Sequence, residues 1–291
     1  KAGLLGMMAA RIAGVPNRLH TVAGMPLMES AGVKRAVLER VEALTYACAT
    51  RVYPNSYNLK GFIESNFSVS PGKLKVLGAG SSNGIDTSWF ERTPDMEEQG
   101  KEIRRRYTIP DDATVYCFVG RIVQDKGINE LVTAFREVLK TEPEARLLLV
   151  GSFEDHLDPI AMETRNAITN NPMIINTGFQ QDMRPFLAAS NVCVFPSYRE
   201  GFPNVVLQAA CMELPCIVSD INGCNEIIDD GVNGRVIPVK QSAPLAKAML
   251  NLSENPTLRC RWGGAARNRV VKDFEQSVLW NEIHNEYLSL L

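Results

Sequence analysis

Six short, mostly apolar segments recur after residue 114 and restrict the fold of the chain more than any other feature. Stretches with helical spacing separate them, as in Leu131, Phe135 and Val138. Segments that do not alternate with polar residues are typical of strands covered on both faces of a parallel sheet. We therefore expect an α/β fold with strands at 115–119, 146–150, 174–176, 192–195, 216–219 and 235–237.

The first third of the chain has a similar but shorter alternation. Helices are expected at 2–13 and 30–49, and strands at 18–22, 51–53 and 74–77. Residues 94–107 are strongly charged, which indicates a solvent-facing helix or a linker. These boundaries predict a first domain, a linker, a second domain and a last helix at 1–93, 94–107, 108–274 and 275–291.

Composition excludes several classes of protein. The 291 residues are 45% hydrophobic and 22% charged, and the net charge of −2 argues against a globally basic nucleic-acid binder. The seven cysteines include no Cys-x-x-Cys pair, so we expect free, buried thiols in a reducing compartment. The most apolar stretch, at 2–15, is too short to span a membrane and contains Arg11. A cytoplasmic protein is therefore expected.

A polar segment follows the fourth expected strand. Pro203 suits the first position of a helix, because its fixed φ fits there and its missing N–H is not needed. The amides of Asn204 and Val205 would then point out of the helix N-terminus, which favours phosphate binding. Glu200 lies just before this helix, and Gln208 lies on the same face as Asn204. The segment therefore predicts a phosphate site beside a hydroxyl-rich ligand.

A second motif lies where the strand at 115–119 ends. Ligands of open α/β sheets bind at the carboxyl ends of the strands, so Arg121 and Lys126 place two positive charges there. Arginine offers a planar fork for phosphate oxygens, and lysine offers a compact charge. The alternative is a surface arginine and a lysine at the start of a helix. Each motif supports the ligand-binding interpretation of the other.

Together the motifs resemble those of glycosyltransferase family 4, which has the GT-B fold, and the resemblance covers nearly all of the chain. The family signature is Glu, seven residues, Glu, here Glu200 and Gln208, and the second motif is the Gly-Arg…Lys-Gly pattern at 120–127. The resemblance implies two Rossmann-like domains that face a cleft, with the donor held mainly by the second. Because the chain starts inside a helical pattern, we expect roughly 60 to 100 upstream residues to be missing from the first domain, which would lower turnover.

The resemblance also implies roles for residues. Arg121 and Lys126 would grip a diphosphate and Glu200 would orient the donor sugar, which makes these three the expected catalytic residues. The expected donor site comprises Gly120, Arg121, Lys126, Phe179, Glu200, Gly201, Phe202, Pro203, Asn204, Val205 and Gln208.

Two members of this set need comment. Gln208 replaces the second acid of the signature, so the ribose contact loses its charge, keeps an acceptor oxygen and gains two donors. Phe179 stands where relatives hold the base largely through backbone contacts, and core packing is its alternative. No cofactor is expected besides the donor substrate. No metal is expected either, because the chain lacks the Asp-x-Asp pair that goes with a metal-bound diphosphate in the other large glycosyltransferase fold.

The implied reaction is transfer of a sugar, with retention, from a nucleotide diphosphate sugar such as a UDP-sugar to a hydroxyl acceptor. The segments at 197–208 and 219–228 resemble bacterial enzymes of capsule, exopolysaccharide or lipopolysaccharide assembly. A glycan or lipid-linked acceptor is expected, with no nucleic-acid partner and with peripheral contact at the inner face of the plasma membrane. A sugar-nucleotide epimerase of the same fold and a non-catalytic nucleotide-sugar-binding module stay open as alternatives.

Overall fold

The computed structural model describes residues 2–291, which form two compact units. The smaller unit contains the residues up to Gly84 together with Asp273–Leu291, and the larger unit is Ile85–Lys272. The larger unit thus begins ahead of the charged segment at 94–107, and the last helix groups with the first part of the chain.

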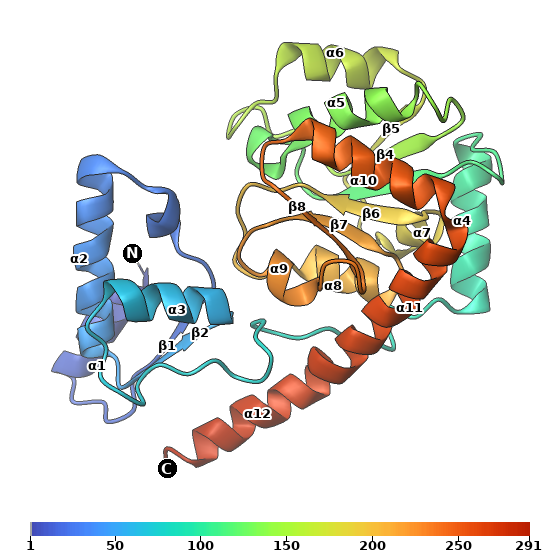
Figure 1. Cartoon of the computed structure of the whole chain (residues 1–291). Coiled ribbons are helices and arrows are strands. Elements are labelled where there is room, and N and C mark those ends of the chain that lie inside the picture. The colour runs from blue at the N-terminus through green and yellow to red at the C-terminus, as the bar shows by residue number, and fades with distance from the viewer. Residues whose placement is uncertain (1) are drawn as a thin grey trace. The chain divides into compact units, whose positions relative to one another are not determined.

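A six-stranded sheet forms the centre of the larger unit (Figure 1). Its strands are β3 (Val115–Val119), β4 (Arg146–Val150), β5 (Ile174–Gly178), β6 (Val192–Phe195), β7 (Cys216–Ser219) and β8 (Gly234–Ile237). All neighbouring strands are parallel, in the order β5-β4-β3-β6-β7-β8. The order reverses between β3 and β6, which is where doubly wound sheets bind ligands.

Helices cover both faces of this sheet (Figure 1). One face carries α5 (Ile128–Val138), α6 (Met162–Asn170) and α10 (Ser242–Glu254), and the other carries α8 (Asn204–Cys211) and α9 (Cys224–Ile227). The remaining helices of this unit are α4 (Pro94–Arg106), α7 (Arg184–Ala188) and nearly all of α11 (Pro256–Asp273). Because both faces are covered, every residue of β3, β4, β6 and β7 is buried.

The charged segment at 94–107 forms helix α4, whose inner face is buried. Thr93 caps its N-terminus by accepting a hydrogen bond from the amide of Met96 at 3.2 Å. Met96 and Ile103 are buried, and a Cβ on Gly100 would lie 2.8 Å from the backbone of Ala188 in α7. The helix therefore belongs to the larger unit and is no linker; its charges dominate the composition because they occupy the outer face.

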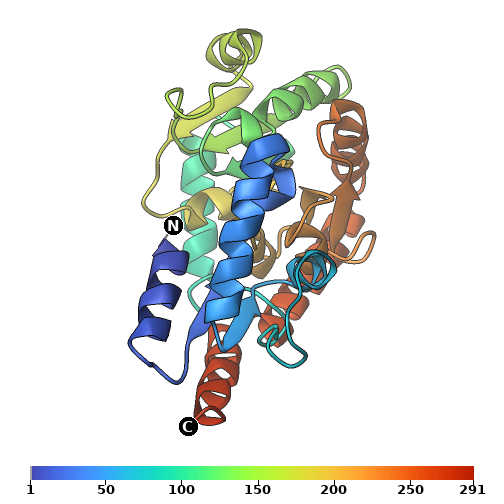
Figure 2. The same cartoon turned by 90° about the vertical axis from the view of Figure 1, so that its left-hand side faces the viewer.

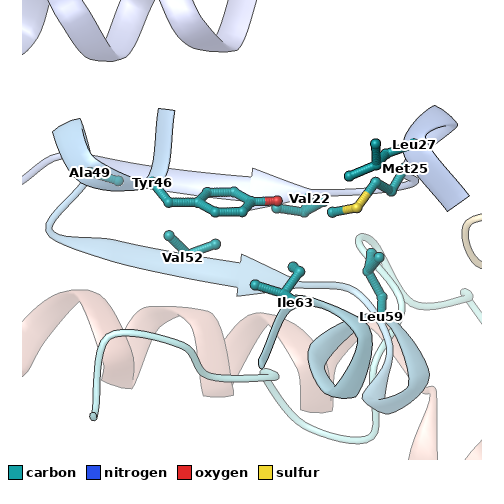
Figure 3. Close-up of a cluster of buried hydrophobic side chains, with 8 residues drawn as sticks. All are labelled: Val22, Met25, Leu27, Tyr46, Ala49, Val52, Leu59 and Ile63. Carbon is teal, nitrogen blue, oxygen red and sulfur yellow. The ribbon is translucent and has the colours of Figure 1, made fainter. Parts of the chain in front are cut away.

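The smaller unit contains a two-stranded parallel sheet of β1 (Leu19–Val22) and β2 (Arg51–Pro54). Its helices are α1 (Ala2–Ile12), η1 (Pro26–Glu29), α2 (Gly32–Cys48), α3 (Tyr57–Asn66) and α12 (Gln276–Leu288). Helices α1 and α2 lie side by side (Figure 2). The core of this unit gathers around the sheet (Figure 3) and comprises Val22, Met25, Leu27, Tyr46, Ala49, Val52, Leu59 and Ile63.

The strand expected at 74–77 is wrong. Only Leu74 pairs with β2, through an isolated parallel bridge to Val52. The amide of Val52 donates to Lys73 O at 2.8 Å and the amide of Lys75 donates to Val52 O at 3.1 Å. The next donor in this ladder would be Pro54, which has no N–H, so the pairing stops.

Helix α12 is tied to β2 through a buried carboxylate. Glu286 is 7% exposed and accepts hydrogen bonds from the hydroxyl of Tyr53 at 3.0 Å and from the ammonium of Lys75 at 2.5 Å. The hydrogen bond and charge of Lys75, together with the bond from Tyr53, lower the pKa of Glu286 despite its burial. The last helix therefore adds a charged contact to the smaller unit.

All seven cysteines are free thiols, and all but Cys260 are buried. Burial raises the pKa of the Cys117 thiol, so it stays protonated and packs as a small apolar residue. Within residues 2–291, no helix combines the length and the apolar character needed to cross a membrane.

Candidate functional site

Parallel strands bring the segments that follow β3, β4, β5 and β6 to one edge of the sheet. These segments contain most of the residues expected to bind a ligand. The order of the strands places the segment after β3 next to the segment after β6, although the two are more than 70 residues apart in sequence. The candidate site is therefore the carboxyl edge of the sheet at β3 and β6.

Lys126 and Glu200 meet at this edge. The Lys126 ammonium forms an ion pair with the Glu200 carboxylate, and both side chains are largely buried, at 15% and 17% exposed. The hydroxyl of Ser197 lies 3.1 Å from the same carboxylate oxygen and donates to it. The Lys126 ammonium also lies 5.7 Å from the centre of the Phe195 ring. Side chains from two distant segments thus fix one charged pair.

The two segments approach each other closely because of Gly127. Lys126 ends the short 3₁₀ turn η2 (Gln124–Lys126), and Gly127 follows with a φ of +70°. A Cβ at this position would lie 2.1 Å from the carbonyl oxygen of Pro196. Only glycine satisfies both the backbone conformation and the contact. The Gly in the Lys-Gly pair therefore has a structural purpose, which is to let the turn that carries Lys126 reach the segment after β6.

Further hydrogen bonds hold the segment after β6 in place. The amide of Tyr198 donates to the carbonyl of Asp125 at 2.8 Å, and the Arg199 guanidinium lies 3.0 Å from the carboxylate of Asp125. The Tyr198 hydroxyl donates to Glu130 in α5 at 2.7 Å. The side-chain amide of Asn222, after β7, donates to the carbonyl of Gly201. Three neighbouring segments thus restrain the backbone around Glu200.

Helix α8 begins one residue later than expected. Pro203 is its N-cap residue, with a φ of −78°, and Asn204 is its first residue. The carbonyl of Pro203 accepts from the amide of Val206 at 3.1 Å, so the amides of Asn204 and Val205 still precede the first hydrogen bond of the helix. The shift therefore leaves the prediction of an anion site at this N-terminus unchanged.

Gln208 carries an unsatisfied acceptor. Its side-chain oxygen Oε1 is buried and has no hydrogen-bond partner among the residues that the structure describes. Asn204, one turn earlier on the same face of α8, is exposed. Buried polar atoms in folded proteins usually have a partner, so this acceptor at the edge of the candidate site is open to a donor from outside the chain.

The remaining expected site residues differ in how exposed they are. Arg121, directly after Gly120 at the end of β3, is 49% exposed and its Nη1 lies 3.3 Å from the Glu154 carboxylate. Phe179, directly after β5, is 77% exposed, so core packing is wrong as its explanation. Phe202 is nearly buried, at 9% exposed, and lies just before α8. All of these lie on the carboxyl side of the sheet.

Sequence reasoning missed several residues of the site. Ser197 and Asn222 both bond to the segment that holds Glu200, and Glu154 pairs with Arg121. Their position directly after strands was visible in the sequence, but their partners depend on which strands are neighbours. No group of three or more His, Cys, Asp or Glu side chains within residues 2–291 has the geometry of a metal site.

Comparisons with known proteins identify relatives of the whole chain. The sequence profile described as glycosyl transferases group 1 matches residues 113–255. A capsular polysaccharide biosynthesis glycosyltransferase of Staphylococcus aureus is 32% identical over all of this chain and 75% of its own length. An Escherichia coli galactosyltransferase, named for UDP-Gal and a GlcNAc-diphosphoundecaprenol acceptor, is 26% identical over all of this chain and 74% of its own length.

A solved structure resembles the whole chain. The Anabaena protein HepE in complex with UDP superimposes with a TM-score of 0.87, at 21% identity, over all of this chain and 76% of HepE. HepE in complex with UDP-glucose gives a TM-score of 0.83 over the same shares. These likenesses confirm the expected α/β fold with parallel sheets.

Proposed function

The chain belongs to the glycosyl transferases group 1 family and is a glycosyltransferase, and from this premise we propose that its larger unit binds a nucleotide diphosphate sugar. The observation that carries the proposal is the meeting of Lys126 with Glu200 just before the N-terminus of α8. A cation, an acceptor carboxylate and free helix amides at one sheet edge suit a ligand with phosphate on one side and hydroxyls on the other.

In this proposal the diphosphate lies against Arg121, Lys126 and the amides of Asn204 and Val205. An ammonium has three donors, so Lys126 can bond a phosphate oxygen while it keeps Glu200 as a partner. These positive groups stabilise the charge that grows on the diphosphate as the bond between the sugar and the phosphate breaks. The restrained backbone around Glu200 keeps this arrangement in place before the donor binds.

The other residues at the edge contact the rest of the donor. Glu200 accepts hydrogen bonds from sugar hydroxyls and orients the ring. The orphaned oxygen of Gln208 accepts one from a ribose hydroxyl, and its amide donates to the other. The exposed ring of Phe179 and the backbone beside it cover the base, and Gly120, Gly201 and Phe202 shape the walls.

We propose that the sugar is transferred with retention of configuration at its anomeric carbon and without a metal ion. The acceptor oxygen forms a bond to the anomeric carbon on the face from which the diphosphate leaves. The acceptor proton passes to an oxygen of the departing phosphate, so no enzyme nucleophile is required. The acceptor is proposed to be a glycan or a lipid-linked sugar of bacterial surface polysaccharide, because two relatives are named for capsule synthesis and for a diphosphoundecaprenol acceptor. Such an acceptor would bring the enzyme to the cytoplasmic face of the membrane.

Nucleotide binding tests the site. We expect Arg121→Ala and Lys126→Ala to weaken UDP or GDP binding by about 1–3 kcal/mol each, the range of charge-assisted hydrogen bonds. Isothermal titration calorimetry measures this with a set of nucleoside diphosphates. Arg136→Ala is the matched control, because Arg136 is 54% exposed and pairs with Glu163 at 2.9 Å in the same unit. Unchanged affinity in both site variants would refute the assignment.

Product analysis separates the activity from its alternatives. A donor labelled in the sugar should yield a labelled acceptor and a free nucleoside diphosphate. An epimerase would leave the label on the nucleotide, and a binding module would leave the donor unchanged. An epimerase would need acid and base groups beside the sugar, for which the sequence offers only His20. This residue packs beside Tyr46 in the smaller unit, with its ring centre 6.1 Å from the tyrosine ring, and burial lowers its pKa.

A further inference from the structure

Glu154 places a negative charge beside Arg121, the residue that we propose binds the diphosphate. It follows β4, and its carboxylate lies 3.3 Å from Nη1 of Arg121. The two side chains are 29% and 49% exposed, so the pair stands at the surface of the carboxyl edge. A phosphate that binds Arg121 must therefore share the guanidinium with this carboxylate or displace it.

The backbone around Glu154 is anchored on both sides. On one side, Phe153 forms a parallel bridge with Ile122, and its ring lies 4.2 Å from the guanidinium carbon of Arg165. On the other side, both carboxylate oxygens of Asp155 lie 2.8 Å from Arg165 Nη1. One arginine of α6 thus holds both neighbours of Glu154.

A second anchor follows four residues later. The carboxylate of Asp158 accepts a hydrogen bond from the amide of Asp125 at 2.8 Å, and its carbonyl accepts from the amide of Gln124 at 3.1 Å. The segment after β4 is therefore fastened to the turn that carries Lys126. The position of Glu154 beside Arg121 is a consequence of this framework rather than of a freely moving surface side chain.

Stability does not account for this arrangement. An exposed ion pair contributes only about 0–1 kcal/mol to folding. A carboxylate fixed near a diphosphate site has a larger effect on the ligand, because it repels the phosphate charge and occupies its cation. In glycosyl transfer the nucleoside diphosphate is the product that must leave before the next turnover, and product release limits many enzymes.

The geometry points to Glu154 as a counter-charge that competes with the diphosphate for Arg121 and so speeds release of the nucleoside diphosphate. This inference rests on the proposed function, since it needs Arg121 to bind the diphosphate. The inference gives Glu154 a role in setting the affinity for the product, beside the residues that hold the donor. Removal of the charge should make the product bind more tightly and leave more slowly.

The test is Glu154→Gln, which keeps the shape of the side chain and removes its charge. We expect UDP to bind about three- to tenfold more tightly, mostly through a slower dissociation rate, and UMP to gain less because it brings less charge. Calorimetry gives the affinities, and stopped-flow displacement gives the rates. Glu163→Gln is the matched control, because the Glu163 carboxylate is 83% exposed and pairs with Arg136 at 2.9 Å rather than with Arg121.

Combining Glu154→Gln with Arg121→Ala tests whether Glu154 acts through Arg121. If Glu154 acts by competing for Arg121, most of the gain from Glu154→Gln should vanish in the double variant. UDP affinity that stays equal or falls in Glu154→Gln would overturn the inference, as would a full gain without Arg121. Failure of the proposed function looks different, because then Arg121→Ala alone would leave UDP binding unchanged.

Discussion

Strands and helices alternate in both units, but the two units bury very different shares of their side chains. In the larger unit four strands are wholly buried, and α5 buries six of its eleven residues. In the smaller unit α1 buries none, and Leu5, Ile12 and Val33 are 67%, 83% and 82% exposed. A strand is covered only when other strands and helices lie on all its sides. Apolar periodicity therefore predicts which elements form, and the number of neighbours decides how much they bury.

The units also differ in where they place paired charges. The larger unit holds Lys126 with Glu200 and Arg121 with Glu154 at the carboxyl edge of its sheet. In the smaller unit the buried carboxylate of Glu286 joins α12 to β2. Charge thus gathers at the edge that we propose as the donor site in one unit, and attaches a helix in the other.

The largest effect should come from matched core substitutions. Leu131→Ala in α5, where the side chain is wholly buried, should lower the free energy of unfolding by about 3–5 kcal/mol, because it leaves a cavity. Leu5→Ala in α1 should change it by less than about 0.5 kcal/mol, since that side chain is exposed. Urea unfolding followed by circular dichroism measures both. Equal losses would contradict the contrast in burial.

A pair of left-handed glycines sharpens the comparison. Gly127→Ala should destabilise the larger unit by about 3 kcal/mol, because the new Cβ meets the Pro196 carbonyl in addition to the backbone strain. Gly72→Ala in the smaller unit, at a φ of +78° with nothing within 4 Å of the new Cβ, should cost only about 1 kcal/mol. Nucleotide affinity should fall in the first variant alone. A loss that is the same for both would show that the close approach at Gly127 is unimportant.

The smallest effect concerns Glu286 and depends on pH. Its folded pKa lies below its ordinary value of 4.5, so its contribution is present above that value and is lost as pH falls through the folded pKa. At pH 7, Glu286→Gln should therefore destabilise the smaller unit by about 1 kcal/mol, and the difference from the parent should shrink toward pH 3. Unfolding curves at several pH values, followed by circular dichroism, measure it. Glu282→Gln, on the exposed face of α12, is the control, and a difference independent of pH would exclude this role for Glu286.

Local sequence patterns were sufficient to predict most of the strands of the larger unit. The strands at 115–119, 146–150, 192–195 and 216–219 were predicted to the residue, because each is a short apolar run between helical stretches. The strand at 74–77 was wrong because Pro54 ends the ladder on a neighbouring strand. Pairing, unlike apolar character, depends on the donors of the partner.

The candidate site also has a part that local motifs predict and a part that depends on the fold. The sequence predicted roles for Arg121, Lys126, Glu200 and Gln208 from two motifs, each about a dozen residues long or shorter. It could not give the partners of these side chains, since Lys126 and Glu200 are 74 residues apart and Arg121 and Glu154 are 33 apart. Contacts between separate segments depend on the order of the strands, which no local spacing encodes.

By itself, then, the sequence determined the order of the elements and the parallel sheet, and it predicted the edge at which we propose that the ligand binds. Spacing within a segment decides these, because hydrophobic periodicity and turn residues act over a few positions. The tertiary structure alone decided that β3 lies beside β6, that Glu200 faces Lys126, and that Glu154 faces Arg121. Those choices follow from packing strands and helices together, where burial and hydrogen bonding join residues that the chain keeps far apart.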